Sequence, residues 1–281
     1  DIGFNGNNII STPNIDKLAK ESVRFNSFYV SPVCAPTRSS LLTGRYSLRT
    51  GVSDTYNGGA IMSGSEVTIA EVLASNNYET GIFGKWHLGD NYPSRPSDQG
   101  FSESLVHLSG GIGQVGDITN RFPIDSAYFD PVLWLNNKKT KFDGYCSDIF
   151  TKEALKFIEK NKDKNFFCYL SFNAPHTPLQ LPAKYYDFYK NVDSKILLES
   201  EPKKMSKRDV NDAKKIYGMI TNIDDNIGKL VNKIEKLGIS ENTILVFMTD
   251  NGPQQIRYNS GLKGLKSDVY EGGIKVPFYL R

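Results

Sequence analysis

The chain has 281 residues, of which 39% are hydrophobic and 23% are charged, and its formal net charge at pH 7 is +3. This is the composition of a globular protein, and no apolar run is long enough to cross a bilayer. The lysines and arginines form no basic block, so the sequence favours neither a membrane-spanning protein nor one whose main partner is nucleic acid. The three cysteines are too few and too irregularly spaced for a disulfide framework or a cysteine metal site.

The first elements expected along the chain are a helix, a strand and a second helix. The helix is expected over residues 12–19, and residues 23–30 alternate in the manner of a strand that leads to Cys34. The second helix is expected over residues 36–42, because Pro36 suits a first helical turn, where its missing N–H costs nothing.

Cys34 therefore stands at the start of a helix. Unpaired backbone N–H groups and the positive end of the helix dipole face a side chain in that position, which favours a negative charge or a bound oxyanion. Arg38, one turn later, adds a fixed positive charge. A lone cysteine is more often a small buried hydrophobic residue, so position alone does not establish a function for Cys34.

A helix over residues 68–75 and a strand over residues 78–83 follow. The alternation of helix and strand predicts an α/β layer architecture with much parallel pairing. Lys85 and His87 come directly after the strand, and catalytic groups in open α/β sheets gather at the carboxyl ends of strands. Without further context, such a pair is more often a solvated lysine and a hydrogen-bonded structural histidine.

Residues 91–144 are rich in Gly, Pro, Ser and Asp. The segment 108–116 lacks the pattern of a nucleotide-binding loop and no clear strand flanks it, so it is interpreted as a substrate-facing loop. His107 lies just before it, has no motif around it, and is interpreted as structural or peripheral.

A helix beginning near Ser147 and a buried strand over residues 166–172 are expected next. His176 follows that strand between Pro175 and Pro178. Two prolines so close together predict a rigid turn, which would hold the histidine at the same kind of sheet edge.

The lysine-rich stretch 194–208 is expected to be a solvated loop, followed by a long amphipathic helix that stops at Gly238. Asp224 and Asp225 of this helix are expected at the surface. Residues 243–248 are continuously apolar, as is typical of a central parallel strand that is covered on both faces.

Asp250 and Asn251 come at the end of that strand. Their side-chain oxygens are hard ligands, suited to Ca²⁺ or Mg²⁺ and poor for softer metals. The alternative is an ordinary Asp-Asn-Gly turn with no ligand.

Five segments of the chain, in order, resemble the signature segments of formylglycine-dependent sulfatases of the alkaline-phosphatase-like superfamily. They are Cys34-Ala-Pro-Thr-Arg38, Gly84-Lys-Trp-His-Leu-Gly89, Ala174-Pro-His-Thr-Pro178, Thr249-Asp-Asn-Gly-Pro253 and residues 262–277, which include Tyr-Glu-Gly-Gly. The resemblance implies an alkaline-phosphatase-like α/β sandwich with a central mixed, mostly parallel sheet flanked by helices.

The resemblance also implies the chemistry at residue 34. Cys34 would be converted to formylglycine by a maturing enzyme, and the hydrate of this aldehyde would attack sulfur. Arg38 and His87 would position the hydrate, and His87 would later help to eliminate the sulfate.

Three further residues match substrate-binding positions of the family. Lys85 and Lys266 would neutralise charge on the sulfuryl oxygens, with Lys263 as the second choice for the latter position. His176 would bind the substrate and protonate the leaving oxygen. Lys85, His176 and Lys266 are also counted as catalytic.

The cofactor implied by the resemblance is a divalent cation, Ca²⁺ with Mg²⁺ as the alternative. Residue 34, Asp250 and Asn251 would be ligands. The family normally carries an apolar strand ending in Asp-Asp ahead of the point where this sequence begins, and a smaller C-terminal subdomain. Residues 1–281 are therefore expected to be a fragment of the catalytic domain that is inactive by itself, from a protein exported to the periplasm, the extracellular space or a lysosome.

The expected function is the hydrolysis of sulfate esters of a carbohydrate or an aryl alcohol, in a protein of glycan degradation. A phosphomonoester or phosphonate hydrolase of the same superfamily is one alternative, since it acts on a tetrahedral anion of similar size. A non-catalytic relative that binds anions is the other.

Overall fold

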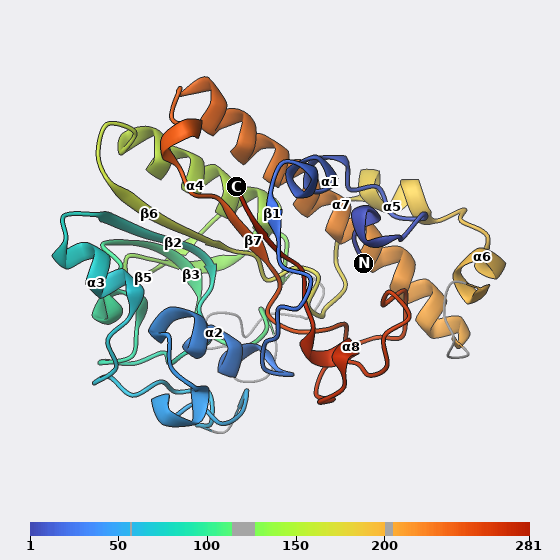
Figure 1. Cartoon of the computed structure of the whole chain (residues 1–281), viewed down its shortest axis with the longest axis horizontal. Coiled ribbons are helices and arrows are strands. Elements are labelled where there is room, and N and C mark those ends of the chain that lie inside the picture. Colours follow the sequence, from blue (N-terminus) through green and yellow to red (C-terminus); the bar gives the residue numbers. More distant parts are fainter. Residues whose placement is uncertain (57, 114–126, 200–204) are drawn as a thin grey trace. The chain divides into compact units, whose positions relative to one another are not determined.

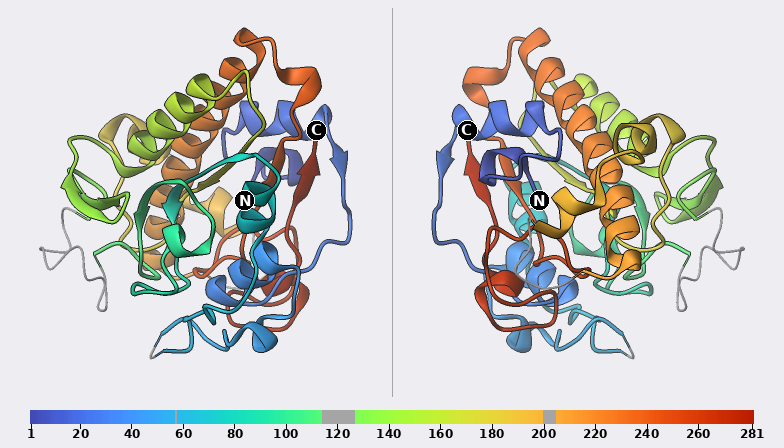
Figure 2. Two further views of the ribbon diagram at one scale, coloured as in Figure 1. Left: turned by 90° about the vertical axis from the view of Figure 1, so that its left-hand side faces the viewer. Right: turned by 90° about the vertical axis from the view of Figure 1, so that its right-hand side faces the viewer.

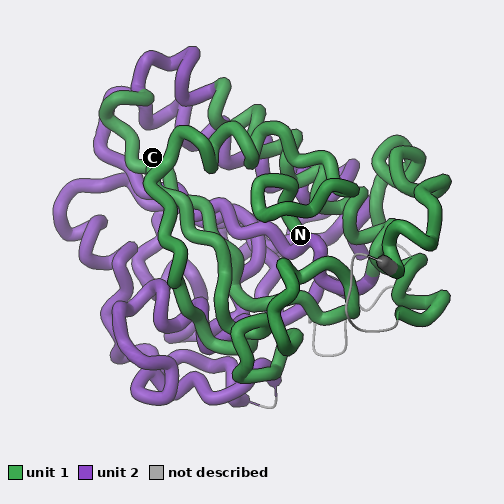
Figure 3. Tube along the Cα trace, turned by 45° about the vertical axis from the view of Figure 1, so that its right-hand side comes forward, with its two compact units in different colours: residues 1–33, 179–232, 240–281 green, residues 34–178, 233–239 purple. Residues whose placement is uncertain are grey.

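The computed structural model describes residues 1–56, 58–113, 127–199 and 205–281 (Figure 1). The chain divides into two compact units, which Figure 3 colours separately. Unit 1 contains residues 1–33, 179–232 and 240–281, and unit 2 contains residues 34–178 and 233–239. Of the loop expected over residues 108–116, the last three residues lie outside the described part of the chain.

Unit 2 is an α/β unit built on a five-stranded sheet. Its helices and strands are α2 (Cys34–Thr43), α3 (Ile69–Ser75), β2 (Glu79–Lys85), β3 (Glu103–His107), β4 (Val132–Leu135), β5 (Lys138–Lys141), α4 (Cys146–Lys160) and β6 (Phe166–Ser171), with short 3₁₀ turns at Ser47–Thr50 and Pro96–Gln99.

The strand order in this sheet is β5-β4-β3-β2-β6. Strand β2 runs parallel to both β3 and β6, whereas β4 runs antiparallel to β3 and β5, so the expected mixed central sheet is confirmed. Strands β3, β4 and β5 lie within residues 91–144, and β3 directly precedes the segment 108–116, so the expectation that no clear strand flanks that segment was wrong. Their turn-rich flanks obscured short strands that alternation alone does not reveal.

Helices pack on both faces of this sheet. Ile82 of β2 packs in one apolar cluster with Ala70 of α3 and with α2. Its neighbour Phe83 points to the opposite face, where its ring lies 5.6 Å from that of Phe157 in α4. This arrangement fixes the ends of β2, β3 and β6 at one edge of the sheet.

Helix α3 shows how local sequence sets one of these elements. The Thr68 hydroxyl accepts a hydrogen bond from the backbone N–H of Glu71, and the Glu71 carboxylate accepts one from the backbone N–H of Thr68. This reciprocal capping box satisfies two backbone donors that the first turn would otherwise leave unpaired.

Unit 1 contains a three-stranded antiparallel sheet in the order β1-β8-β7. Its helices and strands are α1 (Pro13–Lys20), β1 (Val23–Arg24), α5 (Ala183–Tyr189), α6 (Ser194–Glu199), α7 (Lys207–Lys236, whose last turn belongs to unit 2), β7 (Val246–Met248), α8 (Glu271–Ile274) and β8 (Phe278–Leu280), with 3₁₀ turns at Gly3–Asn5 and Ser240–Asn242.

In unit 1, an expected central strand and an expected loop differ from the structure. The apolar run 243–248 forms only the short strand β7, which pairs antiparallel with β8, and Val246 is 45% exposed. An apolar run by itself does not distinguish a central parallel strand from a partly exposed antiparallel one. The lysine-rich stretch expected to be a loop includes helix α6, while residues 200–204 within it lie outside the described part.

Helix α7 is long and continuous (Figure 2). Its apolar side packs in the core of unit 1, with Ile216 and Ile220 among the buried residues. Asp224, expected at the surface, is fully buried, and its carboxylate accepts hydrogen bonds from the backbone N–H groups of Asn14 and Ile15 at 3.1 and 2.7 Å. It thus caps the first turn of α1 from a distant part of the chain, a role that helical periodicity does not reveal.

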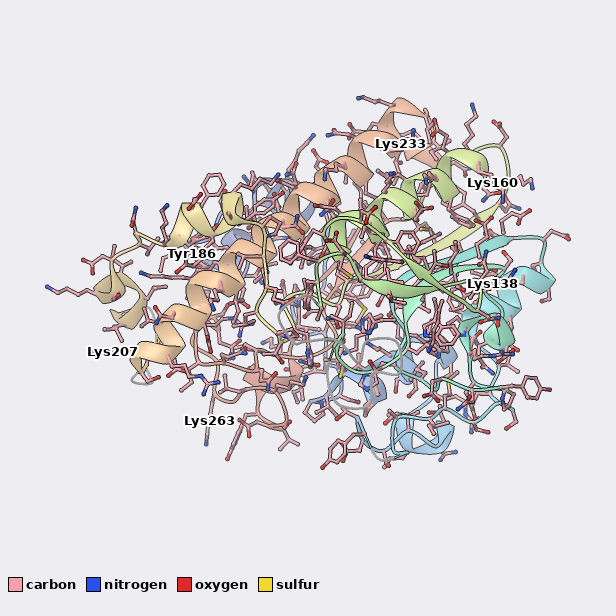
Figure 4. All side chains as sticks on the ribbon, turned by 180° about the vertical axis from the view of Figure 1, so that it is seen from behind. Lys138, Lys160, Tyr186, Lys207, Lys233 and Lys263 are labelled. Carbon is pink, nitrogen blue, oxygen red and sulfur yellow. The ribbon has the colours of Figure 1, made fainter. Side chains whose placement is uncertain are left out.

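The lysines labelled in Figure 4 project outward from different elements. Several are paired with carboxylates, such as Lys160 with Glu103 and Lys233 with Glu159, the latter at 2.8 Å. Exposed pairs of this kind contribute little to stability, but they distribute the positive charge. Among the described residues, no helix combines the length and the apolar character needed to cross a membrane.

Candidate active site

The two units share the predicted site residues unequally. Unit 2 contains five of them and unit 1 contains three. Those of unit 2 are Cys34, Arg38, Lys85, His87 and His176, and those of unit 1 are Asp250, Asn251 and Lys266.

Cys34 is the first residue of α2 and its side chain is buried. The helix begins two residues earlier than expected, so the thiol belongs to the first turn. Its Sγ lies 3.3 Å from Nδ1 of His87. A nucleophile side chain within hydrogen-bond reach of an imidazole nitrogen is the elementary unit of base-assisted nucleophilic catalysis.

The second ring nitrogen of His87 fixes which tautomer faces Cys34. Nε2 lies 2.8 Å from the backbone carbonyl oxygen of Thr55. A carbonyl oxygen can only accept a hydrogen bond, so Nε2 carries the proton in the neutral ring. Nδ1 then presents its lone pair to the side chain of residue 34, as a proton acceptor must.

The backbone conformation at His87 and the close approach of Gly110 hold the imidazole next to Cys34. His87 itself has a positive φ of 63°, which turns the chain sharply after β2. A Cβ atom on Gly110 would lie only 2.6 Å from His87 Nε2, so the chain after β3 passes against the imidazole at a distance that only glycine permits. The ring is therefore confined between Gly110, Thr55 and Cys34.

Arg38 is held at the ends of two strands. Its Nη1 donates to the Lys85 carbonyl oxygen at 2.9 Å and to the Ser171 hydroxyl at 2.6 Å. Ser171 in turn donates to the same carbonyl at 3.0 Å. Arg38 follows Cys34 by one helical turn, so these bonds also fix the start of α2 relative to β2 and β6.

Lys85 is the last residue of β2 and is 2% exposed. It lies in register with His107 at the end of β3, and both side chains are buried. Buried cations at one edge of a sheet attract a negatively charged ligand, because little solvent screens them there. His107 is therefore not peripheral, since it lies within this group.

His176 lies on the turn after β6, in the place expected. Its backbone carbonyl accepts a hydrogen bond from the Tyr128 hydroxyl at 2.7 Å, and Tyr128 accepts one from the Asn173 amide at 2.6 Å. Burial raises the pKa of Tyr128 well above its usual range, so the phenol stays a donor. His176 Nδ1 lies 2.9 Å from the Thr177 carbonyl oxygen, so Nδ1 carries the proton in the neutral ring.

The predicted residues of unit 1 lie on two adjoining segments. Asp250 and Asn251 follow β7, and the backbone N–H of Lys266 donates to the Pro253 carbonyl oxygen at 2.7 Å. Gly252 and Gly273 are joined by a backbone hydrogen bond of 2.9 Å, so the two segments are tied at two points. Lys263, the second choice, places its ammonium 3.8 Å from the centre of the Tyr270 ring.

Asn251 carries an unsatisfied oxygen. Its Nδ2 donates to the Gly252 carbonyl at 2.8 Å, whereas its Oδ1 is buried and has no hydrogen-bond partner among the described residues. Such an oxygen next to a carboxylate is a suitable ligand for a hard cation. The described residues contain no cluster of three or more histidine, cysteine, aspartate or glutamate side chains that could hold a metal by themselves.

Several residues that support the candidate site were not predicted from the sequence. The Thr55 carbonyl, Ser171, Tyr128 and Asn173 all contact predicted residues. Ser171 and Asn173 could have been noticed, because they flank the end of a predicted strand. A backbone carbonyl and a distant tyrosine leave no pattern in a sequence. Asp1 was also given no role, and its carboxylate is bound by Arg257 at 2.7 Å in unit 1.

Known proteins to which the chain is similar are described as sulfatases. A family model described as Sulfatase matches residues 1–281. The ulvan-active sulfatase of Formosa agariphila is 32% identical over 292 residues, covering 100% of this chain and 53% of that protein. The N-acetylgalactosamine-6-sulfatase of Mus musculus is 29% identical and covers 99% of this chain and 54% of its own length. The chain thus spans about half the length of these curated relatives.

Solved structures agree on the fold. The structure of Ps i-CgsB in complex with k-i-k-neocarrahexaose is 33% identical, with a TM-score of 0.82, and covers 99% of this chain and 62% of that one. The phosphonate monoester hydrolase of Agrobacterium radiobacter has a TM-score of 0.67 at 18% identity over 100% of this chain and 65% of its own, which is a likeness of fold alone. The expected alkaline-phosphatase-like fold is confirmed.

Proposed function

The chain belongs to the sulfatase family, and on this premise we propose that the protein hydrolyses sulfate esters, with residue 34 as the nucleophile. The observation that carries the proposal is the 3.3 Å contact between Cys34 Sγ and His87 Nδ1, in the tautomer that the Thr55 carbonyl imposes. This contact supports the proposal, because attack on an anionic ester requires a nucleophile close to its base, and the buried Arg38 and Lys85 supply positive charge.

We propose that Cys34 is converted to formylglycine by a maturing enzyme. The hydrate of an aldehyde has two hydroxyl groups on one carbon, so one can attack sulfur while loss of the proton from the other later expels sulfate. His87 Nδ1 is placed to take that proton, and Arg38 holds the start of α2 in position through its bonds at the strand ends. The unmodified thiol lacks this route for releasing the sulfuryl group.

Lys85 is proposed to neutralise charge on the sulfuryl oxygens, and Lys266 of unit 1 is proposed for the same task. His176 is proposed to protonate the leaving oxygen from Nε2. Because Nδ1 is committed to the Thr177 carbonyl, the ring must be the imidazolium when it donates from Nε2. Tyr128 supports this role by holding the His176 backbone.

A divalent cation, Ca²⁺ or alternatively Mg²⁺, is proposed to be held by Asp250, Asn251 and residue 34. The unpaired Asn251 Oδ1 supports this ligand set. Such a cation would stabilise negative charge that grows on the sulfuryl group.

Sulfated glycans are the proposed substrate class, and an exported protein is the proposed context. The names of the relatives described above support this choice, because they refer to sulfatases and carbohydrates. Aryl sulfates are proposed as usable model substrates.

The proposed reaction is tested with a matched pair of aryl esters. The matured whole protein should hydrolyse the aryl sulfate with a higher kcat/KM than the aryl phosphate that has the same leaving group. The sulfatases among the relatives support this order of substrates. A higher kcat/KM for the phosphate would instead assign the protein to the phosphohydrolase alternative, and no turnover of either would favour the non-catalytic one.

A further inference from the structure

His107 is a buried polar residue to which the proposed mechanism gives no role. It ends β3, lies in register with Lys85, and is 0% exposed. Neither of its ring nitrogens has a hydrogen-bond partner in the described part of the chain. Every neutral imidazole has one N–H donor and one acceptor nitrogen, so both functions are left unused.

The sheet shows which way His107 points. Trp86 and Val106 belong to the apolar cluster on one face of the sheet. Side chains alternate along a strand, so Lys85 and His107 point together to the other face, about 5 Å apart at their bases. His107 therefore shares the face of a proposed sulfate-binding lysine.

Several basic side chains lie close enough to His107 to affect its charge. Burial, followed by neighbouring positive charge, holds the pKa of His107 well below its usual range, and the residues that contribute this charge are Lys85, Arg38, His87 and His176. The imidazole is thus neutral at ordinary pH. The neutral ring has an N–H to donate. The neighbouring cations would attract a negatively charged hydrogen-bond acceptor to the imidazole.

Keeping this histidine is costly unless a ligand uses it. A buried polar group without a partner destabilises a protein by about 1–3 kcal/mol, and a phenylalanine would fill similar space without that cost. Unpaired buried groups in native proteins usually mark a site filled by a ligand or an ordered water.

We propose that His107 is a further substrate-binding residue, whose ring N–H donates a hydrogen bond to an oxygen of the bound sulfate group. The inference rests on the proposed function and extends its site from β2 to β3. A water molecule held between His107 and the rest of the unit is the competing explanation, and the experiment separates the two.

The test measures binding of inorganic sulfate by calorimetry, together with kcat/KM for an aryl sulfate, in the whole protein. His107→Phe should weaken sulfate binding by about tenfold or more, as expected for loss of a hydrogen bond to a charged group. Its melting temperature should be unchanged or higher, since two unpaired nitrogens are removed. His107→Gln, which keeps a donor, should recover part of the affinity.

Trp134→Phe is the matched control. Trp134 lies in β4, opposite Val106, and its Nε1 is also buried without a partner among the described residues. It packs against the cluster on the other face of the sheet. This variant removes an unpaired nitrogen from the same sheet and should leave sulfate binding unchanged.

Sulfate affinity and kcat/KM within twofold of wild type in a folded His107→Phe protein would overturn the inference and assign the imidazole to a bound water or to packing. If His107→Phe does not fold, nitrogen NMR of the wild-type histidines decides, since sulfate must then shift the His107 signals. Sulfate binding needs no turnover, so His107-dependent binding without hydrolysis would refute the proposed function and leave this inference standing.

Discussion

Replacing Cys34 with alanine is expected to abolish hydrolysis of sulfate esters by the whole protein. The substitution removes the Sγ that lies 3.3 Å from His87 Nδ1, and with it the proposed nucleophile. Loss of a covalent nucleophile removes the reaction path itself, so residual activity should be at background. The measurement is kcat/KM for an aryl sulfate after production with a maturing enzyme.

Cys168→Ala is the matched control for that variant. Burial raises the pKa of the Cys168 thiol to about 12, so this cysteine is chemically inert at neutral pH. It lies in β6 of unit 2, the unit that also contains Cys34. This variant should retain activity, and substantial turnover by the Cys34→Ala protein would exclude residue 34 as the nucleophile.

His176→Ala is expected to slow hydrolysis by an amount that depends on the leaving group. A positioned general acid typically contributes roughly 10²–10⁴-fold, and the need for it grows with the basicity of the departing oxygen. A sugar or alkyl sulfate should therefore lose most of its rate. An activated aryl sulfate should be largely spared, because a phenolate leaves readily without a proton. The two substrates are compared by kcat/KM.

Tyr128→Phe tests the same acid role of His176 with a milder change. It removes the hydroxyl that donates to the His176 carbonyl and accepts from Asn173, while the imidazole itself remains. The variant should show the same dependence on leaving group with a smaller loss. Equal losses on sugar and aryl sulfates in the His176→Ala protein would remove the acid role.

The sequence could predict which site residues of unit 2 lie close together, because parallel strands end at the same edge of a sheet. Lys85 ends β2 and His176 follows β6, its parallel neighbour, so the two predicted residues come to the same edge of one sheet. Cys34 joins them because the helix that it starts packs against this sheet. These are local signals, which strand ends and helix starts carry in a few residues.

Other features depended on contacts between distant parts of the chain. Asp224 is buried because it caps α1 some two hundred residues away, and helical periodicity cannot show that. The Thr55 carbonyl selects the His87 tautomer, yet a backbone atom has no sequence signature. His107 was interpreted as structural or peripheral because strand β3 was not predicted, and its register with Lys85 was therefore unknown.

An oxygen on the side chain of residue 34 is proposed to attack sulfur, and the Cys34→Ser variant provides a direct test. Its hydroxyl can attack sulfur with His87 Nδ1 as base, releasing the alcohol and forming a sulfate ester of the serine. It has no second hydroxyl on the same carbon, so the sulfate cannot be expelled and the adduct should accumulate.

The measurement is mass spectrometry of the peptide that carries residue 34, after the Cys34→Ser protein has been incubated with an aryl sulfate. The proposed chemistry predicts one sulfuryl group on that peptide, about one equivalent of released phenol and no further turnover. An unmodified peptide from a protein that continues to release phenol would contradict it.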